Sequence, residues 1–251
     1  MSLCLICSSA LLIDGSLSPT AAHPGRKFTQ CDNCRSIQLA AASGAPTANQ
    51  TAGRRLGSAK RFGRDYAMAM MGKAILGTAN IDLHWWQPGV SEDRKRIAAI
   101  PGITSITELP LAVEGPGGPD SVHTEGPTAD LLIGNEVVQC LKDPVEDLSN
   151  ALRRIRTDGL AILSTDLNMG DNPDRMKFLR QRPHTMMWSF EALTYVAQRD
   201  GFTVDCRLPM TAVDRSLTRK RYVLMTRSAD VRRRIRRYFG HVAFAPSEPA
   251  T

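Results

Sequence analysis

The fold is decided by residues 129–167, "ADLLIGNEVVQCLKDPVEDLSNALRRIRTDGLAILSTDL". This stretch opens with an apolar run at 129–134, interrupted only by Asp130, and closes with a second expected buried strand at 160–167. Such runs are typical of strands in a parallel sheet that is covered on both faces. The segment between them has apolar residues at helical spacing. The stretch therefore predicts a strand, a crossover helix and a second, parallel strand.

The expected crossover helix has signals at both ends. Asp143 can cap its first turn, Pro144 suits its first position, and Glu146 lies where a capping box has its acid. Gly159 follows the expected end of the helix. One apolar stripe should face the sheet, made of Val145, Leu148, Leu152 and Ile155.

The alternation of strands and helices extends through the chain from residue 61. Apolar spacing predicts helices at 64–76, from Ser91 onward and at 189–201. Residues 114–127, rich in glycine and proline, should form a loop with room for one short strand. Further strands are expected at 81–86, 102–109, 202–208 and 221–227. This order predicts a parallel sheet with helices on both faces and a hairpin of the last two strands at one edge.

Length and charge limit the class of protein. At 251 residues, with 42% hydrophobic residues, the chain is long enough for one large domain with a substantial core. Its 32 basic and 25 acidic residues give a formal net charge of +7, which would favour contact with phosphate-rich partners. Much of this excess lies in residues 207–239. We interpret that segment as a solvated basic helix rather than a nucleic-acid site, because it has no recognisable reading module or stacking aromatics.

Composition divides the chain into three parts. Residues 1–40 hold four of the six cysteines, residues 41–60 have the composition of a linker, and residues 61–251 are expected to form the main domain. No apolar run approaches the roughly 20 residues that a membrane-spanning helix needs. We therefore expect no membrane partner and a cytoplasmic location. A secretory or lipoprotein leader around Cys7 is the alternative for the apolar N-terminus.

Four cysteines form two C-x-x-C pairs, "CLIC" at 4–7 and "CDNC" at 31–34. Each pair can turn two thiolates toward one ion, so the pairs would supply the four sulfurs of a tetrahedral, structural zinc site. Disulfides or unliganded thiols are the alternatives. Cys140 and Cys206 lie in apolar segments and are expected to be small core residues. The expected zinc ligands are Cys4, Cys7, Cys31 and Cys34.

The stretch at 129–167 also resembles class I S-adenosylmethionine-dependent methyltransferases. Residues 184–204, "HTMMWSFEALTYVAQRDGFTV", look like a later segment of that family. Residues 28–39, "FTQCDNCRSIQL", resemble the second knuckle of its zinc-bearing members, which act on sugars and related small molecules. The resemblance implies a Rossmann-like, doubly wound α/β fold with a mostly parallel seven-stranded sheet, an antiparallel edge strand and a small N-terminal zinc knuckle. The matching residues of the first stretch are Glu136, Val137, Asp143, Pro144, Gly159 and the strand up to Thr165.

The resemblance places the cofactor, S-adenosylmethionine, against the turn that follows the strand at 81–86. The family's G-x-G-x-G turn corresponds to residues 87–91, "QPGVS", in which only the middle glycine is retained. Glycine is used in such turns because the backbone must approach the cofactor closely. Ser91 can also cap the next helix, and core packing is the alternative for Trp86. The cofactor contacts expected here are Trp86, Gln87, Gly89 and Ser91.

Four further positions follow from the resemblance. Glu108 ends an expected strand and would bind the ribose hydroxyls of the cofactor, with a surface glutamate as the alternative. Asn135 and Glu136 would face the amino-acid part of the cofactor. Cys140 replaces a histidine that the family often has at that position. His184 is therefore the catalytic candidate, as a general base for a hydroxyl acceptor, or else a residue that packs its loop.

Together these residues imply an enzyme, an S-adenosylmethionine-dependent methyltransferase whose small-molecule acceptor is a sugar or a secondary metabolite. The altered turn supports a first alternative, a catalytically degenerate binding module with the methyltransferase fold. The basic C-terminal region supports a second alternative, a nucleic-acid methyltransferase. No feature of the sequence assigns an oligomeric state.

Overall fold

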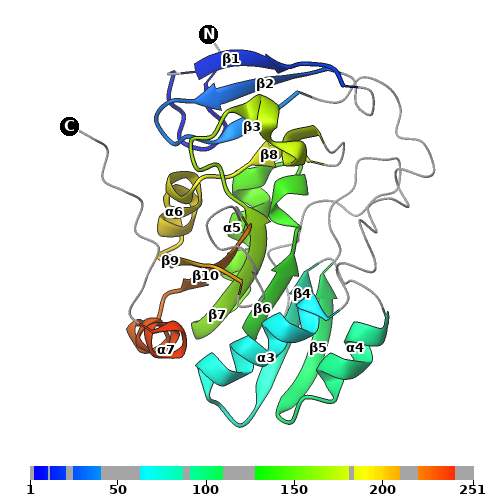
Figure 1. Cartoon of the computed structure of the whole chain (residues 1–251). Coiled ribbons are helices and arrows are strands. Elements are labelled where there is room, and N and C mark those ends of the chain that lie inside the picture. The colour runs from blue at the N-terminus through cyan, green and yellow to red at the C-terminus, as the bar shows by residue number, and fades with distance from the viewer. Residues whose placement is uncertain are drawn as a thin grey trace.

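Figure 1 shows a large sheet flanked by helices, with a smaller sheet next to it. The expected linker at 41–60 and the expected loop at 114–127 lie outside the described part of the chain. This computed structural model describes residues 3–10, 12–20, 25–40, 63–86, 91–109, 128–180, 184–209 and 220–240.

The large sheet has six strands within the described residues, in the order β5-β4-β6-β7-β10-β9. They are β4 (Ile81–Trp86), β5 (Ile103–Leu109), β6 (Ala129–Asn135), β7 (Ile155–Asp166), β9 (Thr203–Arg207) and β10 (Lys220–Thr226). β4 to β7 pair in parallel, whereas β10 is antiparallel to both β7 and β9. The doubly wound α/β fold is confirmed, with six described strands where seven were expected. The antiparallel strand is not at the edge, because the β9–β10 hairpin places β9 outermost.

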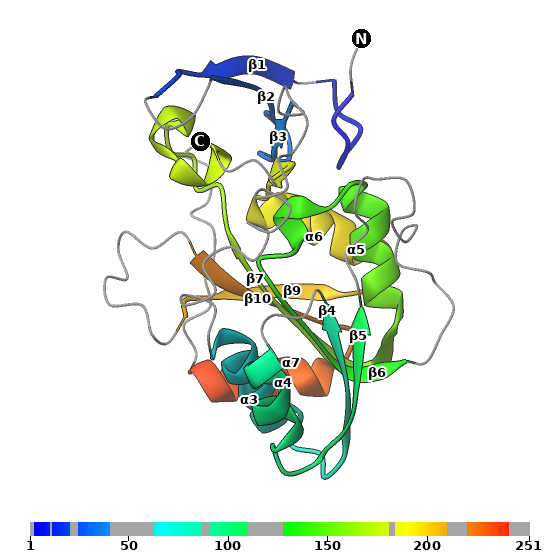
Figure 2. The ribbon, with the colours of Figure 1, turned by 90° about the vertical axis from the view of Figure 1, so that its right-hand side faces the viewer.

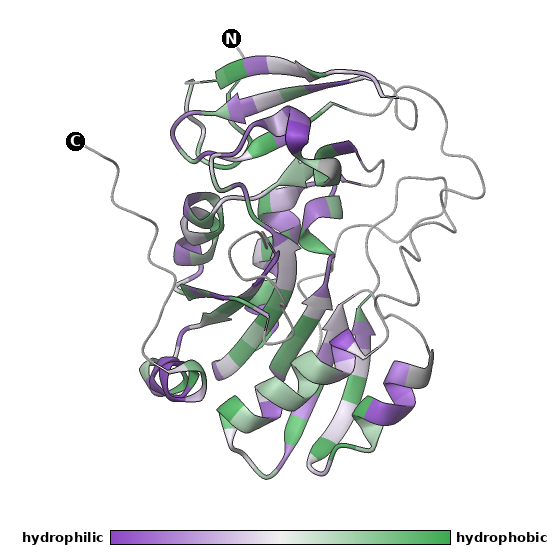
Figure 3. Ribbon diagram, viewed as in Figure 1, coloured by the Kyte–Doolittle hydropathy of each residue, from purple (hydrophilic) through white to green (hydrophobic). Residues whose placement is uncertain are grey.

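Helices cover both faces of the large sheet (Figure 2). One face carries α3 (Arg64–Leu76), α4 (Ser91–Ala98) and α7 (Ala229–Phe239). The other face carries α5 (Pro144–Arg153) and α6 (Phe190–Arg199). Side chains alternate across β6, so Leu131 and Ile133 pack toward the first group and Leu132 packs toward the second. Figure 3 shows the hydrophobic residues along β6, and burial on both faces explains why the run is apolar at nearly every position.

At the start of α5 the predicted cap Asp143 is confirmed, whereas the predicted capping-box acid Glu146 is wrong. The Asp143 side chain accepts a hydrogen bond from the amide of Glu146 at 3.0 Å. The reciprocal bond of the capping box comes from Asp147, whose carboxylate accepts from the amide of Asp143 at 3.0 Å. The acid of the box is therefore one residue later than expected.

The expected end of this helix is wrong. α5 ends at Arg153, and Ile155 is already paired with Ala129 of β6 at the start of β7. Gly159 lies inside β7 instead of following the helix. Ile155 has the spacing of a helical residue, but it pairs with β6 and so belongs to a strand. This contact between distant residues cannot be seen in the local sequence pattern.

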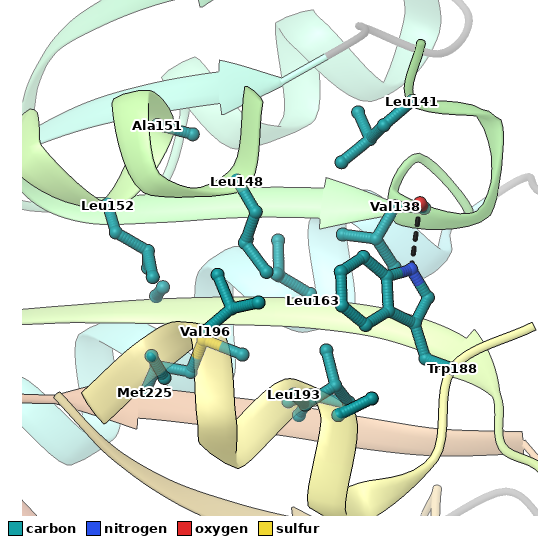
Figure 4. Packing of buried hydrophobic residues seen from close by; sticks show 14 of the residues in the cluster. Val138, Leu141, Leu148, Ala151, Leu152, Leu163, Trp188, Leu193, Val196 and Met225 are labelled. Carbon is teal, nitrogen blue, oxygen red and sulfur yellow. Dashed lines mark hydrogen bonds between the residues drawn. The ribbon is translucent and has the colours of Figure 1, made fainter. Parts of the chain in front are cut away.

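Trp188 belongs to the buried cluster between the large sheet and helices α5 and α6, and Figure 4 shows its ring next to Val138. Its indole ring is fully buried, and Nε1 donates a hydrogen bond to the carbonyl of Val138 at 2.9 Å. Leu193 and Leu148, from α6 and α5, belong to the same cluster. Cys206 is buried in this core as expected, and Cys140 packs partly buried against it.

Replacing Trp188 with phenylalanine should lower the free energy of unfolding by about 2–3 kcal/mol. The smaller ring leaves a gap, and the Val138 carbonyl loses its donor. Urea denaturation followed by circular dichroism would show a lower midpoint at an unchanged slope. Tyr195→Phe, at an exposed position of α6, is the matched control and should shift stability by less than about 0.5 kcal/mol. An unchanged midpoint for Trp188→Phe would contradict the expected role of the indole.

The small sheet combines three strands from the first 40 residues with one strand from a distant part of the sequence. Its antiparallel strands are, in order, β1 (Leu12–Leu17), β2 (Arg26–Cys31), β3 (Ile37–Leu39) and β8 (Met186–Met187). We call the described residues from 3 to 40 the knuckle module. β8 completes the sheet of this module from a distant part of the sequence. The knuckle was expected from its cysteines, whereas the small sheet was not expected. The division of the chain into three parts remains a prediction.

Candidate functional site

The knuckle module brings its four cysteines together. The sulfur atoms of Cys4, Cys7, Cys31 and Cys34 all lie within 4.8 Å of one another. The Sγ–Sγ distance is 3.6 Å for the pair Cys4–Cys34 and 3.6 Å for the pair Cys7–Cys31. A Zn–S bond of about 2.3 Å gives sulfur–sulfur edges of about 3.8 Å in a tetrahedron. The arrangement therefore fits one zinc ion.

Polar groups around these sulfurs suit thiolates. The side-chain amide of Asn33 donates to Cys7 Sγ at 3.4 Å, and that of Gln38 donates to Cys4 Sγ at 3.4 Å. The backbone amide of Cys34 donates to Cys31 Sγ at 3.5 Å. None of the six cysteines is in a disulfide, and all six lie in the described part of the chain. Four sulfur donors leave no coordination position for a substrate, which favours a structural role.

A second group of expected residues gathers at the carboxyl edge of the large sheet. Because β4, β5 and β6 are parallel, their carboxyl ends meet at one edge. Trp86 ends β4, Glu108 lies one residue before the end of β5, and Asn135 ends β6. Ligands of open α/β sheets bind at this edge.

Of the expected cofactor turn, the structure describes only the flanking residues Trp86 and Ser91. Gln87 and Gly89 lie outside the described part of the chain. Ser91 is the first residue of α4, but its side chain is not described. The roles of these three residues therefore remain predictions.

Trp86 and Glu108 differ in their surroundings. Trp86 is fully buried on the face of the sheet that carries α5 and α6, where it packs with Val137. Its indole nitrogen has no hydrogen-bond partner among the described residues. Glu108 is exposed and forms an ion pair with Arg94 of α4. The carboxylate of Glu108 is thus accessible at the edge, next to the strand that leads into the expected cofactor turn.

Glu136 is the centre of a group of charged side chains. Its backbone has a φ of 57°, in the left-handed region that side-chain-bearing residues rarely adopt. Its carboxylate pairs with Arg64 at 3.2 Å and with Lys220. Lys220 also lies 3.3 Å from the carboxylate of Asp166, the last residue of β7. Rare backbone conformations often occur at functional sites, and this one is in the position expected for a cofactor contact.

Asn135 precedes Glu136 and is held by the neighbouring strand β7. It is buried, and its side-chain oxygen accepts a hydrogen bond from Ser164 Oγ at 2.5 Å. Of the charged neighbours of Glu136, Arg64, Lys220 and Asp166 were not expected from the sequence. Asp166 could have been found, because it is an acid at the end of an apolar strand.

His184 is fully buried, unlike a typical surface histidine of a loop. Its Nδ1 lies 2.8 Å from the carbonyl oxygen of Phe178, and the two rings are 4.1 Å apart between centroids. A carbonyl oxygen only accepts, so Nδ1 carries the proton and Nε2 is the unprotonated nitrogen. Burial lowers the pKa of His184 to about 4, and Glu136 opposes this shift. Nε2 has no hydrogen-bond partner among the residues that the structure describes.

Gln139 is a candidate that the sequence did not indicate. It belongs to the short 3-10 helix η1 (Val138–Cys140), and it is fully buried. Its Oε1 accepts from Thr165 Oγ1 at 3.2 Å, and its Nε2 is a second buried nitrogen without a partner in the described ranges. Its backbone carbonyl accepts from the amide of Thr185, the residue after His184. Two polar side chains with unused hydrogen-bonding capacity therefore lie on neighbouring segments beside the carboxyl edge.

The basic helix α7 belongs to another part of the molecule. It carries five arginines, and Arg234 donates to the carbonyl of Leu76, the last residue of α3. It follows Thr226, the end of β10, whose hydroxyl donates to the carbonyl of Gly159 near the start of β7. The arginines are therefore attached at the amino edge of the sheet, opposite to Glu136. None of the helices described here has the length and apolar character needed to span a membrane.

Comparisons with known proteins give a match at the level of structure only. No protein-family model and no curated protein matches the sequence. Among solved structures, an O-methyltransferase family protein from Burkholderia thailandensis is 11% identical, with 71% of this chain and 59% of that chain covered and a TM-score of 0.50. The mitomycin 7-O-methyltransferase MmcR is 16% identical, with 73% and 58% covered and a TM-score of 0.50.

These likenesses establish the fold. The chain has the fold of class I S-adenosylmethionine-dependent methyltransferases, as the resemblance of residues 129–167 implied. It spans less than two thirds of the length of both structures.

Proposed function

We propose that this chain is an S-adenosylmethionine-dependent methyltransferase that acts on a hydroxyl group of a small molecule, a sugar or a secondary metabolite. The observation that carries the proposal is the buried, proton-free Nε2 of His184 close to the carboxyl edge of a methyltransferase-type sheet. Gln139 is bonded to Thr165 near the end of β7, and its carbonyl accepts from the amide of Thr185, the residue after His184.

The expected cofactor contacts follow the carboxyl edge. Glu108 would accept hydrogen bonds from the ribose hydroxyls, since its carboxylate is exposed and pairs with the likewise exposed Arg94. Asn135 and Glu136 would contact the amino-acid part. Trp86, Gln87, Gly89 and Ser91 would contribute the remaining contacts at the turn. When bound, S-adenosylmethionine supplies an electrophilic methyl group.

His184 would act as the general base. Its Nε2 would accept the proton of the acceptor hydroxyl, while the carbonyl of Phe178 holds the ring in the required tautomer. Burial disfavours the resulting imidazolium, and the carboxylate of Glu136 favours it. Gln139 Nε2 would donate a hydrogen bond to the acceptor and help to place its oxygen.

The four cysteines would bind one structural zinc ion. Cys4, Cys7, Cys31 and Cys34 provide the sulfur geometry, and the N–H donors around them would stabilise the thiolates. The ion would stabilise the knuckle module and take no part in methyl transfer.

Cofactor binding is the first test of the proposal. Isothermal titration calorimetry with S-adenosylhomocysteine should give a dissociation constant well below millimolar. No binding at millimolar ligand would contradict an active enzyme and favour the degenerate binding module. In that case, the double change Gln87→Gly and Ser91→Gly should create binding, because it restores both missing glycines of the turn.

Glu108→Gln should weaken S-adenosylhomocysteine about tenfold or more, because a neutral amide makes weaker hydrogen bonds to the ribose diol than a carboxylate does. Asp158→Asn is the matched control. Asp158 is exposed near the start of β7, so this change should leave the affinity unaltered. Equal affinities for the wild type and Glu108→Gln would mean that Glu108 is only a surface partner of Arg94.

The nucleic-acid alternative makes a different prediction. Binding through the arginines of α7 would weaken steeply as salt is raised. The placement of α7 at the amino edge favours the small-molecule acceptor, because a nucleic acid on this helix would lie away from Glu136 and His184. Fluorescence anisotropy with labelled RNA and DNA at several salt concentrations would distinguish the two.

A further inference from the structure

The knuckle module is joined directly to the segment that carries His184. β3 of the module pairs with β8, and the amide of Leu39 donates to the carbonyl of Thr185 at 2.9 Å. The amide of Thr185 in turn donates to the carbonyl of Gln139 at 2.8 Å. The residue after His184 is therefore held between the module and the carboxyl edge of the large sheet.

The two ends of the segment that carries His184, at Asn168 and Ser189, are also hydrogen-bonded to the turn of the second cysteine pair. Asn168 Nδ2 donates to the carbonyl of Arg35 at 2.7 Å, and Ser189 Oγ donates to the carbonyl of Cys34 at 2.5 Å. The amide of Asn168 donates to the carbonyl of Trp188 at 2.7 Å and closes the loop. Both ends of the loop are thus bound to backbone at or next to an expected zinc ligand.

Arg26, on β2 of the module, makes the most direct contact with His184. Its guanidinium Nη2 donates to the His184 carbonyl at 2.7 Å, and Nη1 donates to the Leu179 carbonyl at 3.4 Å. Its Nε donates to the carbonyl of Ala40 at 3.0 Å. Leu179 follows Phe178, whose carbonyl orients the His184 ring. One side chain therefore fixes the backbone on both sides of the Phe178–His184 hydrogen bond.

We propose that Arg26 is a positioning residue for His184 and that the knuckle module is the support through which it acts. The planar guanidinium is suited to this task because its donors reach several carbonyls at fixed angles, which a lysine cannot do. The catalytic meaning of this placement rests on the proposed function. The placement itself can be measured without any acceptor.

The experiment uses the full zinc-loaded chain with ¹⁵N-labelled histidine at pH 7.5. In the wild type, nuclear magnetic resonance should show His184 as the Nδ1–H tautomer, assigned by its loss in His184→Asn. Arg26→Met keeps the aliphatic stem and removes the donors. It should give a mixture of both tautomers and about tenfold faster exchange of the Thr185 amide. Arg26→Lys, which keeps the charge and a single donor nitrogen, should restore part of the protection.

Arg180→Met is the matched control. Arg180 also links the loop to the module, because it donates to the carbonyl of Ser18 and pairs with Asp174, but it has no contact with His184 among the described interactions. It should leave the tautomer unchanged. Zinc content, measured by mass spectrometry, should stay at one ion per chain in every variant.

Three results would overturn the positioning role. One is a wild-type tautomer and wild-type Thr185 exchange in Arg26→Met. Another is the same tautomer change in Arg180→Met. The third is loss of zinc from Arg26→Met, because the whole knuckle module would then have lost its structure. A wild-type His184 that already carries its proton on Nε2 would instead contradict the proposed base. The two failures are therefore distinguishable.

Discussion

Exchanging His184 for asparagine should lower kcat by about 10²–10⁴-fold, the usual contribution of a general base. The asparagine amide can still donate to the Phe178 carbonyl, as Nδ1 does, so the loop keeps its anchor. It has no group in the place of Nε2 that can take a proton at neutral pH. Release of S-adenosylhomocysteine during methyl transfer would measure the rate.

The affinity for S-adenosylhomocysteine is the internal control of this experiment and should be the same in both proteins. The pH dependence gives a second readout. Burial lowers the pKa of His184 to about 4, so the ring is unprotonated at neutral pH and the wild-type rate should decline only as the pH falls toward 4. A wild-type kcat in His184→Asn would mean that placement of the acceptor, without a base, accounts for the reaction.

Loss of the metal should have the largest effect on stability. Cys34→Ser should abolish stoichiometric zinc and lower the free energy of unfolding by about 4 kcal/mol or more, as expected when a structural metal is lost. Cys34 is buried in the core cluster that also contains Trp188, so the damage should reach beyond the knuckle. Scanning calorimetry should show the midpoint of thermal unfolding lowered by about 10 °C or more.

Cys140→Ser is the control for this change. Cys140 is partly buried and lies outside the four-sulfur group, so its replacement should leave one zinc ion per chain. If Cys34→Ser retained a full equivalent of zinc with an unchanged midpoint, Cys34 would not be a zinc ligand. If the wild type itself held no zinc, the four cysteines would be a cluster of reduced thiols instead.

The main sheet could be predicted because its signals are local. A short stretch of sequence is enough to recognise the apolar segments of β6 and β7 and the capping residue Asp143. The end of α5 could not be predicted, since Ile155 pairs with Ala129 and this contact is absent from the local pattern. The same limitation explains the small sheet, whose strand β8 comes from a distant segment.

The candidate site was only partly predictable for a similar reason. Glu108, Asn135 and Glu136 were expected from the resemblance to methyltransferases, and the parallel strands bring them to a common edge. Lys220 reaches Glu136 from an antiparallel strand far along the chain, and no spacing rule connects them. The burial of His184, which decides its pKa, depends on side chains from several segments and cannot be read from one position.

The pairing of β3 with β8 has a consequence for the order in which the chain folds during synthesis. Residues 4–34 hold all four expected zinc ligands, so they could bind metal soon after they leave the ribosome. The fourth strand of their sheet, β8, is missing until Met186 and Met187 have been synthesised, about 150 residues later. The edge of β3 that later pairs with β8 therefore remains unpaired while the large sheet is still being translated.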